Sequence, residues 1–72
     1  MTEYLKTTMK VHRAIHNLTQ ADLAALIGIT RKSINAIEMG HMVPSTILAL
    51  KLAKALDVTV ETLFFLDDSL NL

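Results

Sequence analysis

The alternation of apolar and polar positions between residues 19 and 38 predicts two short helices joined by a tight turn. Thr19 stands just before an apolar-periodic run, and Asp22 follows three residues later, the spacing of a capping box. We therefore expect a helix to begin at Gln20. Gly28 supplies the residue type that tolerates a left-handed backbone where such a helix ends.

The second helix of this stretch is expected over about residues 31–39, with Thr30 as its N-cap. Ile34 and Ile37 give it an inward face at i, i+3 spacing. The side chains left facing outward are Arg31, Lys32, Asn35 and Ala36.

Three further helices are predicted on either side of this pair. The first is expected from about Glu3 to His16, with inward positions at Leu5, Met9 and His12. After Pro44, a helix capped by Ser45 carries one continuous apolar stripe, made of Leu48, Ala49, Leu52, Ala53 and Leu56. A last helix, capped by Thr59, has an apolar side made of Val60, Leu63 and Phe64.

Length and composition fit this helical pattern. Seventy-two residues allow one small domain, which we place at residues 1–66, followed by a short C-terminal tail at residues 67–72. The chain is 51% apolar but only 4% aromatic, so its core must be built from aliphatic side chains and methionine, as in packed helices. The expected fold class is all-α, a compact five-helix bundle.

Several function classes find no support in the composition. The chain contains no cysteine, which excludes disulfides and thiolate chemistry and fits an intracellular setting. Its apolar runs are too short for a membrane helix, and it lacks the pattern of an export signal. We therefore expect a cytoplasmic protein that does not bind membranes and has no evident small-molecule ligand, cofactor or metal.

Charge is segregated along the chain, although seven basic and seven acidic residues cancel overall. Residues 1–56 contain all the lysines and arginines but only three acids, whereas residues 57–72 contain four acids and no base. A positive face near residues 31–35, with the acidic end held away from it, would suit binding to a polyanion.

Five stretches together resemble the helix-turn-helix regulators of the Cro and phage-repressor type, also called the xenobiotic-response-element family. They are LTQADLA at 18–24, the turn at Gly28, TRKSINAIEMG at 30–40, Pro44-Ser45 and LALKLAKALDV at 48–58. The resemblance implies a lambda-repressor-like fold that inserts its third helix in the major groove of DNA. It also implies a structural salt bridge between Arg13 and Glu38.

The resemblance also assigns roles to residues of the two central helices. Gln20 would bind a DNA phosphate, Ser33 would touch the backbone, and Arg31, Lys32, Asn35 and Ala36 would face bases. Arginine and lysine can donate to guanine, and asparagine can pair with adenine N6 and N7. The complete set of expected DNA-contacting residues is Gln20, Thr30, Arg31, Lys32, Ser33, Asn35 and Ala36.

Simpler interpretations remain open for some of these residues. Arg31 and Lys32 could form an ordinary solvated helix start, although their charge opposes the helix dipole there. The hydroxyl of Ser33 could bond within its own helix, and Asn35 could be an ordinary exposed polar side chain.

Two other features are open to functional or structural interpretation. His12 and His16 have the i, i+4 spacing of a metal-binding pair, but without a third ligand we expect a partly buried His12 and an exposed His16. Phe64 and Phe65 are expected to serve as core and interface rather than as a ligand pocket.

Three function classes follow. The first is a sequence-specific regulator that binds double-stranded DNA. The second is a protein-interaction component, such as the antitoxin of a toxin-antitoxin module. The third, an enzyme, is not expected, because no nucleophile-base arrangement, acid pair or phosphate loop is visible.

The apolar side chains exceed what one small core can bury, which predicts a homodimer through the last helix and neighbouring parts of the helix before it. The side chains left over for such an interface are Ile15, Ile47, Leu50, Phe65 and Leu66.

Overall fold

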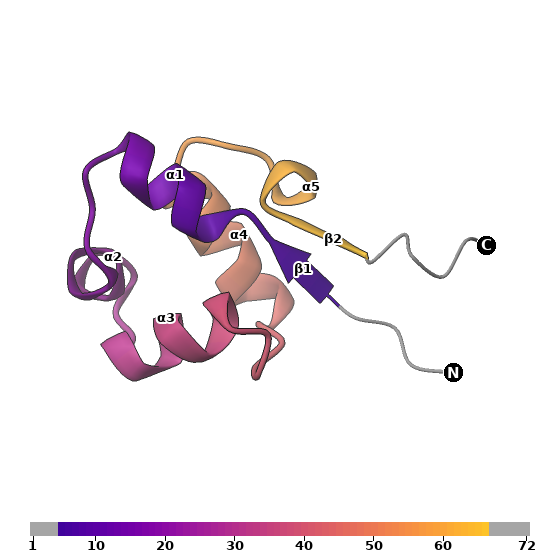
Figure 1. Ribbon diagram of the computed structural model, residues 1–72, viewed down its shortest axis with the longest axis horizontal. Coiled ribbons are helices and arrows are strands. Elements are labelled where there is room, and N and C mark those ends of the chain that lie inside the picture. The colour runs from indigo at the N-terminus through magenta and orange to yellow at the C-terminus, as the bar shows by residue number, and fades with distance from the viewer. Residues whose placement is uncertain (1–4, 67–72) are drawn as a thin grey trace.

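A computed structural model of the chain describes residues 5–66. In order, the elements are β1 (Leu5–Thr7), α1 (Met9–Ile15), α2 (Gln20–Ile27), α3 (Arg31–Glu38), α4 (Thr46–Ala55), α5 (Val60–Leu63) and β2 (Phe64–Leu66) (Figure 1). The predicted five-helix architecture is confirmed for this part of the chain, with a two-stranded sheet added to it. The expected tail at 67–72 lies outside the described residues.

The prediction of a helix from Glu3 to His16 was wrong at its start. Residues 5–7 form β1, which pairs antiparallel with β2 in the register Leu5↔Leu66, and α1 begins only at Met9. Thr7 and Thr8 favour this break, because threonine hydroxyls compete with helical hydrogen bonds. Thr7 Oγ1 donates to Leu63 O at 2.8 Å and accepts from Met9 N at 3.1 Å, which ties the start of α1 to the end of α5.

The last helix is likewise shorter than its apolar pattern indicates. Phe64 was expected on the apolar side of this helix, but it is extended, with φ −129° and ψ 138°, and is the first residue of β2. It remains in the core, since only 8% of its surface is exposed. The strand pairing therefore replaces a further helical turn, and Phe64 is buried from a strand instead of from a helix.

The turns around α2 form as the sequence indicates. Asp22 N donates to Thr19 Oγ1 at 3.0 Å and Thr19 N donates to Asp22 Oδ2 at 2.9 Å, which completes the capping box. Gly28 ends α2 in the left-handed region at φ 78°, and Gly40 follows α3 at φ 79°. The predicted caps Thr30, Ser45 and Thr59 each accept a backbone N–H of their own helix.

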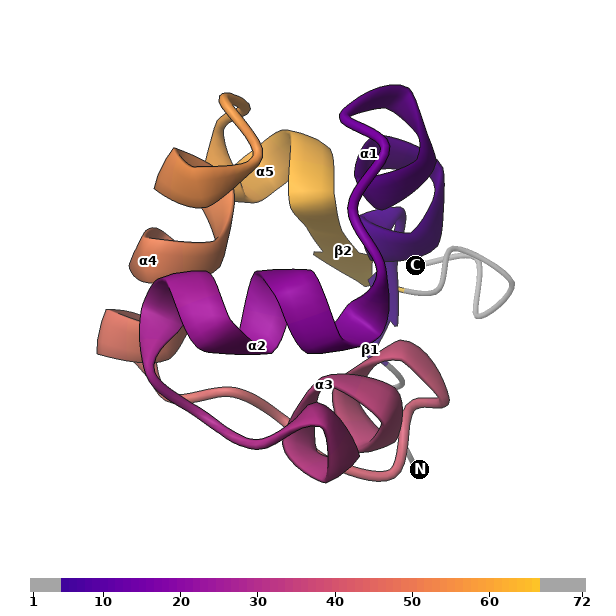
Figure 2. The same ribbon diagram turned by 90° about the vertical axis from the view of Figure 1, so that its left-hand side faces the viewer.

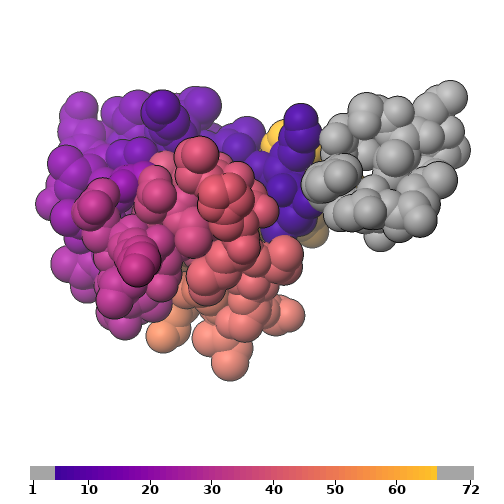
Figure 3. All heavy atoms as spheres, turned by 60° about the horizontal axis from the view of Figure 1, so that its bottom comes forward, coloured from indigo at the N-terminus to yellow at the C-terminus, as the bar shows by residue number. Residues whose placement is uncertain are grey.

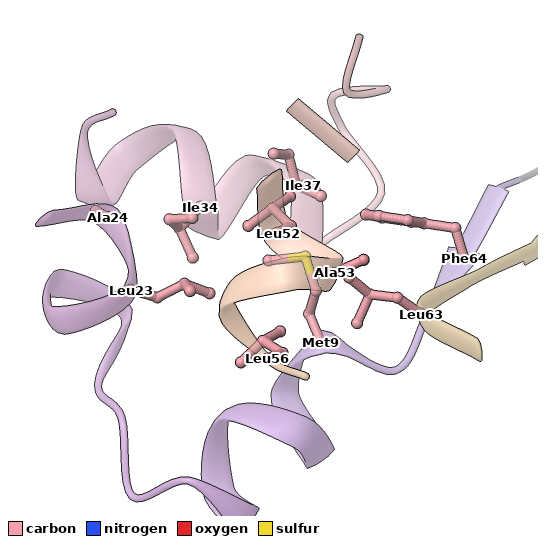
Figure 4. Close-up of a cluster of buried hydrophobic side chains, with 10 residues drawn as sticks. All are labelled: Met9, Leu23, Ala24, Ile34, Ile37, Leu52, Ala53, Leu56, Leu63 and Phe64. Atoms are coloured by element: carbon pink, nitrogen blue, oxygen red, sulfur yellow. The ribbon is translucent and has the colours of Figure 1, made fainter. Parts of the chain in front are cut away.

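One apolar core joins all five helices (Figure 4). Its members are Met9, Leu23, Ala24, Ile34, Ile37, Leu52, Ala53, Leu56, Leu63 and Phe64. Ile27 and Leu48, which were also expected inside, pack against it while partly buried. Within residues 5–66, every helix falls short of the length and apolar character that spanning a membrane requires.

The arrangement of the helices leaves α3 on one side of the molecule. Figure 2 shows α2 crossing the middle of the view, with α3 below it, α4 on the left, α1 on the right, and α5 above it between these two. In Figure 4, Ile34 points from α3 toward Leu23 of α2. Replacing such a buried isoleucine by alanine typically costs about 2–5 kcal/mol, so α3 is firmly held on the domain.

Candidate nucleic-acid interface

The outer face of α3 is polar and the inner face is buried. Ile34 and Ile37 expose 0% and 2% of their surfaces, whereas Arg31, Lys32 and Asn35 are exposed, as their spacing predicts. Ala36 and Ser33 are half-buried at the edge of this face. In Figure 3, the magenta and pink atoms of α3 lie at the surface, next to the salmon atoms of the chain that leads into α4.

The first turn of α3 is closed by its own hydroxyl groups. Ser33 N donates to Thr30 Oγ1 at 3.1 Å, and the Oγ atoms of the two residues lie 3.0 Å apart. The local contact considered for Ser33 is therefore present. Each of these two hydroxyl groups can form one more hydrogen bond, because a hydroxyl has one donor hydrogen and two acceptor lone pairs.

Gln20 connects α2 to the outer face of α3. Its Oε1 accepts from Arg31 Nη1 at 3.1 Å, while its Nε2 donates to Asn35 Oδ1 at 3.1 Å and to Glu38 Oε1 at 3.0 Å. Both N–H groups of this amide are thus used within the protein. The structure brings together three of the expected DNA-contacting residues, Gln20, Arg31 and Asn35, in one hydrogen-bonded group.

Glu38 belongs to this group and also to the salt bridge implied by the family resemblance. Arg13 Nε lies 2.6 Å from Glu38 Oε2, and Arg13 Nη2 donates to Glu38 Oε1 at 3.1 Å. The two side chains expose 14% and 8% of their surfaces. The prediction that Arg13 and Glu38 pair across α1 and α3 is confirmed, and a further bond from Arg13 Nη1 to Leu18 O at 2.9 Å secures the guanidinium.

The pairing shifts the pKa values of both groups. Burial alone would raise the pKa of Glu38, but the hydrogen bonds from Arg13 and Gln20, with the charge of Arg13, outweigh it and hold that pKa below its usual value. The hydrogen bond to Glu38 raises the pKa of Arg13. Hydrogen bonds from Thr19 lower the pKa of Asp22 at the start of α2. These groups therefore carry their charges at neutral pH.

The positive groups of α3 are available for a partner. Within residues 5–66, the salt bridge joins Arg13 to Glu38, and neither Arg31 nor Lys32 forms an ion pair. A hollow of about 440 Å³ opens beside the start of α2 and is lined by Arg13, Asn17, Leu18, Thr19, Gln20, Ala21 and Arg31. At the start of α2 the N–H of Asp22 already donates to Thr19 Oγ1, but the backbone N–H groups of Gln20 and Ala21 have no partner among residues 5–66 and could donate to an anion in this hollow.

Part of this geometry has no signal in the amino-acid sequence. The bonds from Gln20 to Asn35 and Glu38 span 15 and 18 residues, and no local spacing indicates them. The hollow also includes Asn17. Its positive φ of 56° follows the end of α1 in the place expected, but no local spacing indicates that Asn17 and Arg31 line the same hollow.

The burial of His12, His16 and Phe64 is as the simpler structural interpretations expect, whereas the interface role expected for Phe65 stays a prediction. His12 is half-buried and His16 is exposed, with its Nε2 2.8 Å from Leu56 O. Among residues 5–66, no group of three or more His, Asp or Glu residues could hold a metal ion. Phe64 lies in the core, and Phe65 is 43% exposed.

Comparison with a family model, with related sequences and with solved structures indicates the same family. A helix-turn-helix family model matches residues 10–63. An uncharacterized HTH-type transcriptional regulator of Methanocaldococcus jannaschii is 47% identical over 64 residues, which cover 89% of this chain and 97% of that protein. Another uncharacterized HTH-type transcriptional regulator, YgzD of Bacillus subtilis, is 39% identical over 64 residues, with 89% and 97% covered.

A solved structure shares the fold as well as part of the sequence. The restriction-modification controller protein C.AhdI of Aeromonas hydrophila superposes with a TM-score of 0.70 at 33% identity, covering 75% of this chain and 82% of its own. Together with the capped α2–α3 pair and its glycine turn, these matches show that the chain belongs to the helix-turn-helix family of the Cro and phage-repressor type.

Proposed function

We propose that this protein is a transcriptional regulator that binds double-stranded DNA by inserting α3 into the major groove, as a two-fold dimer on a pseudo-palindromic operator. One observation carries the proposal. On α3, Arg31, Lys32 and Asn35 are exposed without charged partners among residues 5–66, while Ile34 and Ile37 anchor the opposite face in the core. A helix held in this way presents donors on a rigid support, as groove recognition requires.

The outer face of α3 suits a groove about 12 Å wide. Arg31 and Lys32 supply N–H donors for guanine O6 and N7, and Asn35 supplies an amide for a base edge. Ala36, half-buried beside them, is small enough to let the helix approach and to contact a thymine methyl group.

The start of α2 supplies the phosphate contact in this proposal. A backbone phosphate would occupy the hollow next to Thr19, Gln20 and Arg31, facing the first N–H groups of the helix. Since both side-chain N–H groups of Gln20 already donate within the protein, we assign its phosphate contact to the backbone N–H. Ser33 and Thr30 would add hydroxyl contacts at the start of α3.

The dimer is proposed from uncovered apolar surface on α4 and β2. The side chains expected to be left over are indeed exposed: Ile15 65%, Ile47 69%, Leu50 56%, Phe65 43% and Leu66 53%. Of these, Leu50 lines a groove of about 460 Å³, together with Leu5, Pro44, Thr46, Ala49, Val60, Glu61 and Phe64. We propose that a second copy covers the surface around α4, α5 and β2, which would place the two α3 helices in successive major grooves about 34 Å apart.

Selection of bound sequences from a random pool of double-stranded DNA tests this function. The parent chain is expected to enrich a pseudo-palindrome whose half-sites are one helical turn apart. Lys54→Ala removes a positive charge from an exposed position of α4 that lies beside Leu26 and Ile27 and outside the proposed groove, so it serves as a control and should enrich the same site. Failure of the parent to enrich any sequence would contradict the proposal, and enrichment of a single asymmetric site would contradict the dimer alone.

A further inference from the structure

The outward face of α3 continues past Asn35 to an apolar side chain. Met39 follows Asn35 by four residues and Lys32 by seven, and these spacings bring side chains onto one face of a helix. The backbone of Met39 is still helical, with φ −83° and ψ −5°, and its N–H donates to Asn35 O at 2.9 Å. The side chain is 61% exposed, so a face that begins with positive and polar groups ends with a thioether.

The turn after α3 holds Met39 at the end of this face. His41 N and Met42 N both donate to Ala36 O, at 2.8 and 3.2 Å, and Gly40 has a left-handed backbone with φ 79°. The chain therefore folds back directly after Met39. The side chain itself stays adaptable, because it has three rotatable bonds and borders a hollow of about 540 Å³ between α3 and β1.

An apolar group on this face has one matching partner in the major groove. Base edges in the groove present hydrogen-bond donors and acceptors, and the apolar group among them is the C5-methyl group of thymine. The thioether of Met39 carries no charge and is only a weak acceptor, so a phosphate offers it little. Contact with a thymine methyl group would remove apolar surface of both partners from water, which is favourable.

We infer that Met39 is a specificity-determining residue that reads the methyl group of a thymine in each half-site. This inference rests on the proposed DNA-binding function. The seven residues from Lys32 to Met39 span about 10 Å of helix. Successive base pairs are only about 3.4 Å apart, so Met39 extends the recognised sequence beyond the base pairs that face the first turn of α3.

Replacing thymine by deoxyuridine tests this inference, because it removes the methyl group and leaves every hydrogen-bonding group in place. Each thymine of one half-site of the selected duplex is replaced in turn, and the duplexes are titrated with the parent, Met39→Ala and Leu26→Ala. Leu26 is the matched control, since it is an apolar side chain with 62% exposure that lies beside Lys51 and Lys54, away from α3. Circular dichroism establishes that each variant retains the fold.

The expected result is a loss that depends on Met39. At one thymine of the half-site, deoxyuridine should weaken binding of the parent by about fourfold, as for one methyl-sized group left unburied. Met39→Ala should bind the thymine and deoxyuridine duplexes equally at that position, whereas Leu26→Ala should keep the fourfold difference. A thymine that contacts Ala36 would keep its preference in Met39→Ala, which separates the two contacts.

Outcomes that overturn the inference are separate from those that overturn the function. A half-site without thymine, or deoxyuridine that changes binding of the parent at no position, would overturn the role of Met39 while leaving DNA binding intact. Thymine preferences that all persist in Met39→Ala, or a preference that Leu26→Ala also loses, would do the same. A parent that enriches no sequence at all would overturn the proposed function, and this inference with it.

Discussion

Replacing Glu38 by alanine should destabilise the protein far more than replacing an exposed charged residue. Glu38 accepts two hydrogen bonds from Arg13 and one from Gln20, and its side chain is only 8% exposed. Without the carboxylate, Arg13 keeps its bond to Leu18 O, but its charge loses its counter-ion in a site where the guanidinium is only 14% exposed.

Removing one partner of a buried ion pair costs around 3–5 kcal/mol. Because Arg13 retains one bond and some contact with water, we expect the lower end of this range, about 3 kcal/mol. A domain of this size changes its Tm by roughly 4–8 °C for each kcal/mol, so the Tm of Glu38→Ala should fall by about 12–24 °C. A loss of about 3 kcal/mol is a large part of the total free energy of unfolding of a small domain, which is about 5 kcal/mol.

Thermal unfolding followed by circular dichroism measures this effect at neutral pH. Lys54→Ala is the control, since it removes one charge from an exposed position on α4 that lies outside the groove proposed for the second copy, and it should change the Tm by only a few degrees. Removing both charges in Arg13→Met with Glu38→Leu should restore part of the loss, because neither charge is then left unpaired. A Tm for Glu38→Ala equal to that of Lys54→Ala would refute the buried pair.

The remaining predictions concern DNA contact, assembly and pH. Arg31→Ala and Lys32→Ala should each weaken binding to the selected site by about 1–3 kcal/mol with an unchanged Tm; unchanged binding isotherms would remove α3 as the contact surface. Phe65→Asp should shift the dimer toward monomer in analytical ultracentrifugation and weaken operator binding, whereas Val11→Asp, at an exposed apolar position of α1, should remain a dimer. Because the folded-state pKa of Glu38 lies below its unfolded value, the stability it contributes is present above about pH 4.3 and is lost as pH falls through the lowered pKa. The Tm of the parent should thus fall more steeply than that of Glu38→Gln between neutral pH and pH 3. Plots of Tm against pH that run parallel for the two proteins would count against the pairing.

Local chemistry made the centre of this fold predictable. The caps at Thr19, Thr30 and Ser45 and the left-handed turn at Gly28 each depend on a few adjacent residues, and all form as expected. The inward face of α3 followed from the spacing of its isoleucines in the same way. Such features can be read from sequence because the interactions that decide them lie within one turn of the chain.

The features that were missed depend on contacts between distant residues. The register Leu5↔Leu66 joins opposite ends of the described chain, and the apolar pattern of residues 3–16 fits a helix equally well until that partner strand is known. The orientation of Asn35 depends on Gln20 and, behind it, on the Arg13–Glu38 pair. The outward face of α3 could therefore be predicted, whereas the direction of its hydrogen-bonding groups needed the packed structure.

Methylation interference on the selected operator tests the central claim that α3 binds in the major groove. Dimethyl sulfate modifies guanine N7 in the major groove and adenine N3 in the minor groove. We predict that guanine N7 methylation in both half-sites blocks binding of the parent protein, and that adenine N3 methylation does not. Interference from adenine N3 alone, with guanine N7 methylation tolerated throughout the site, would contradict the insertion of α3 into the major groove.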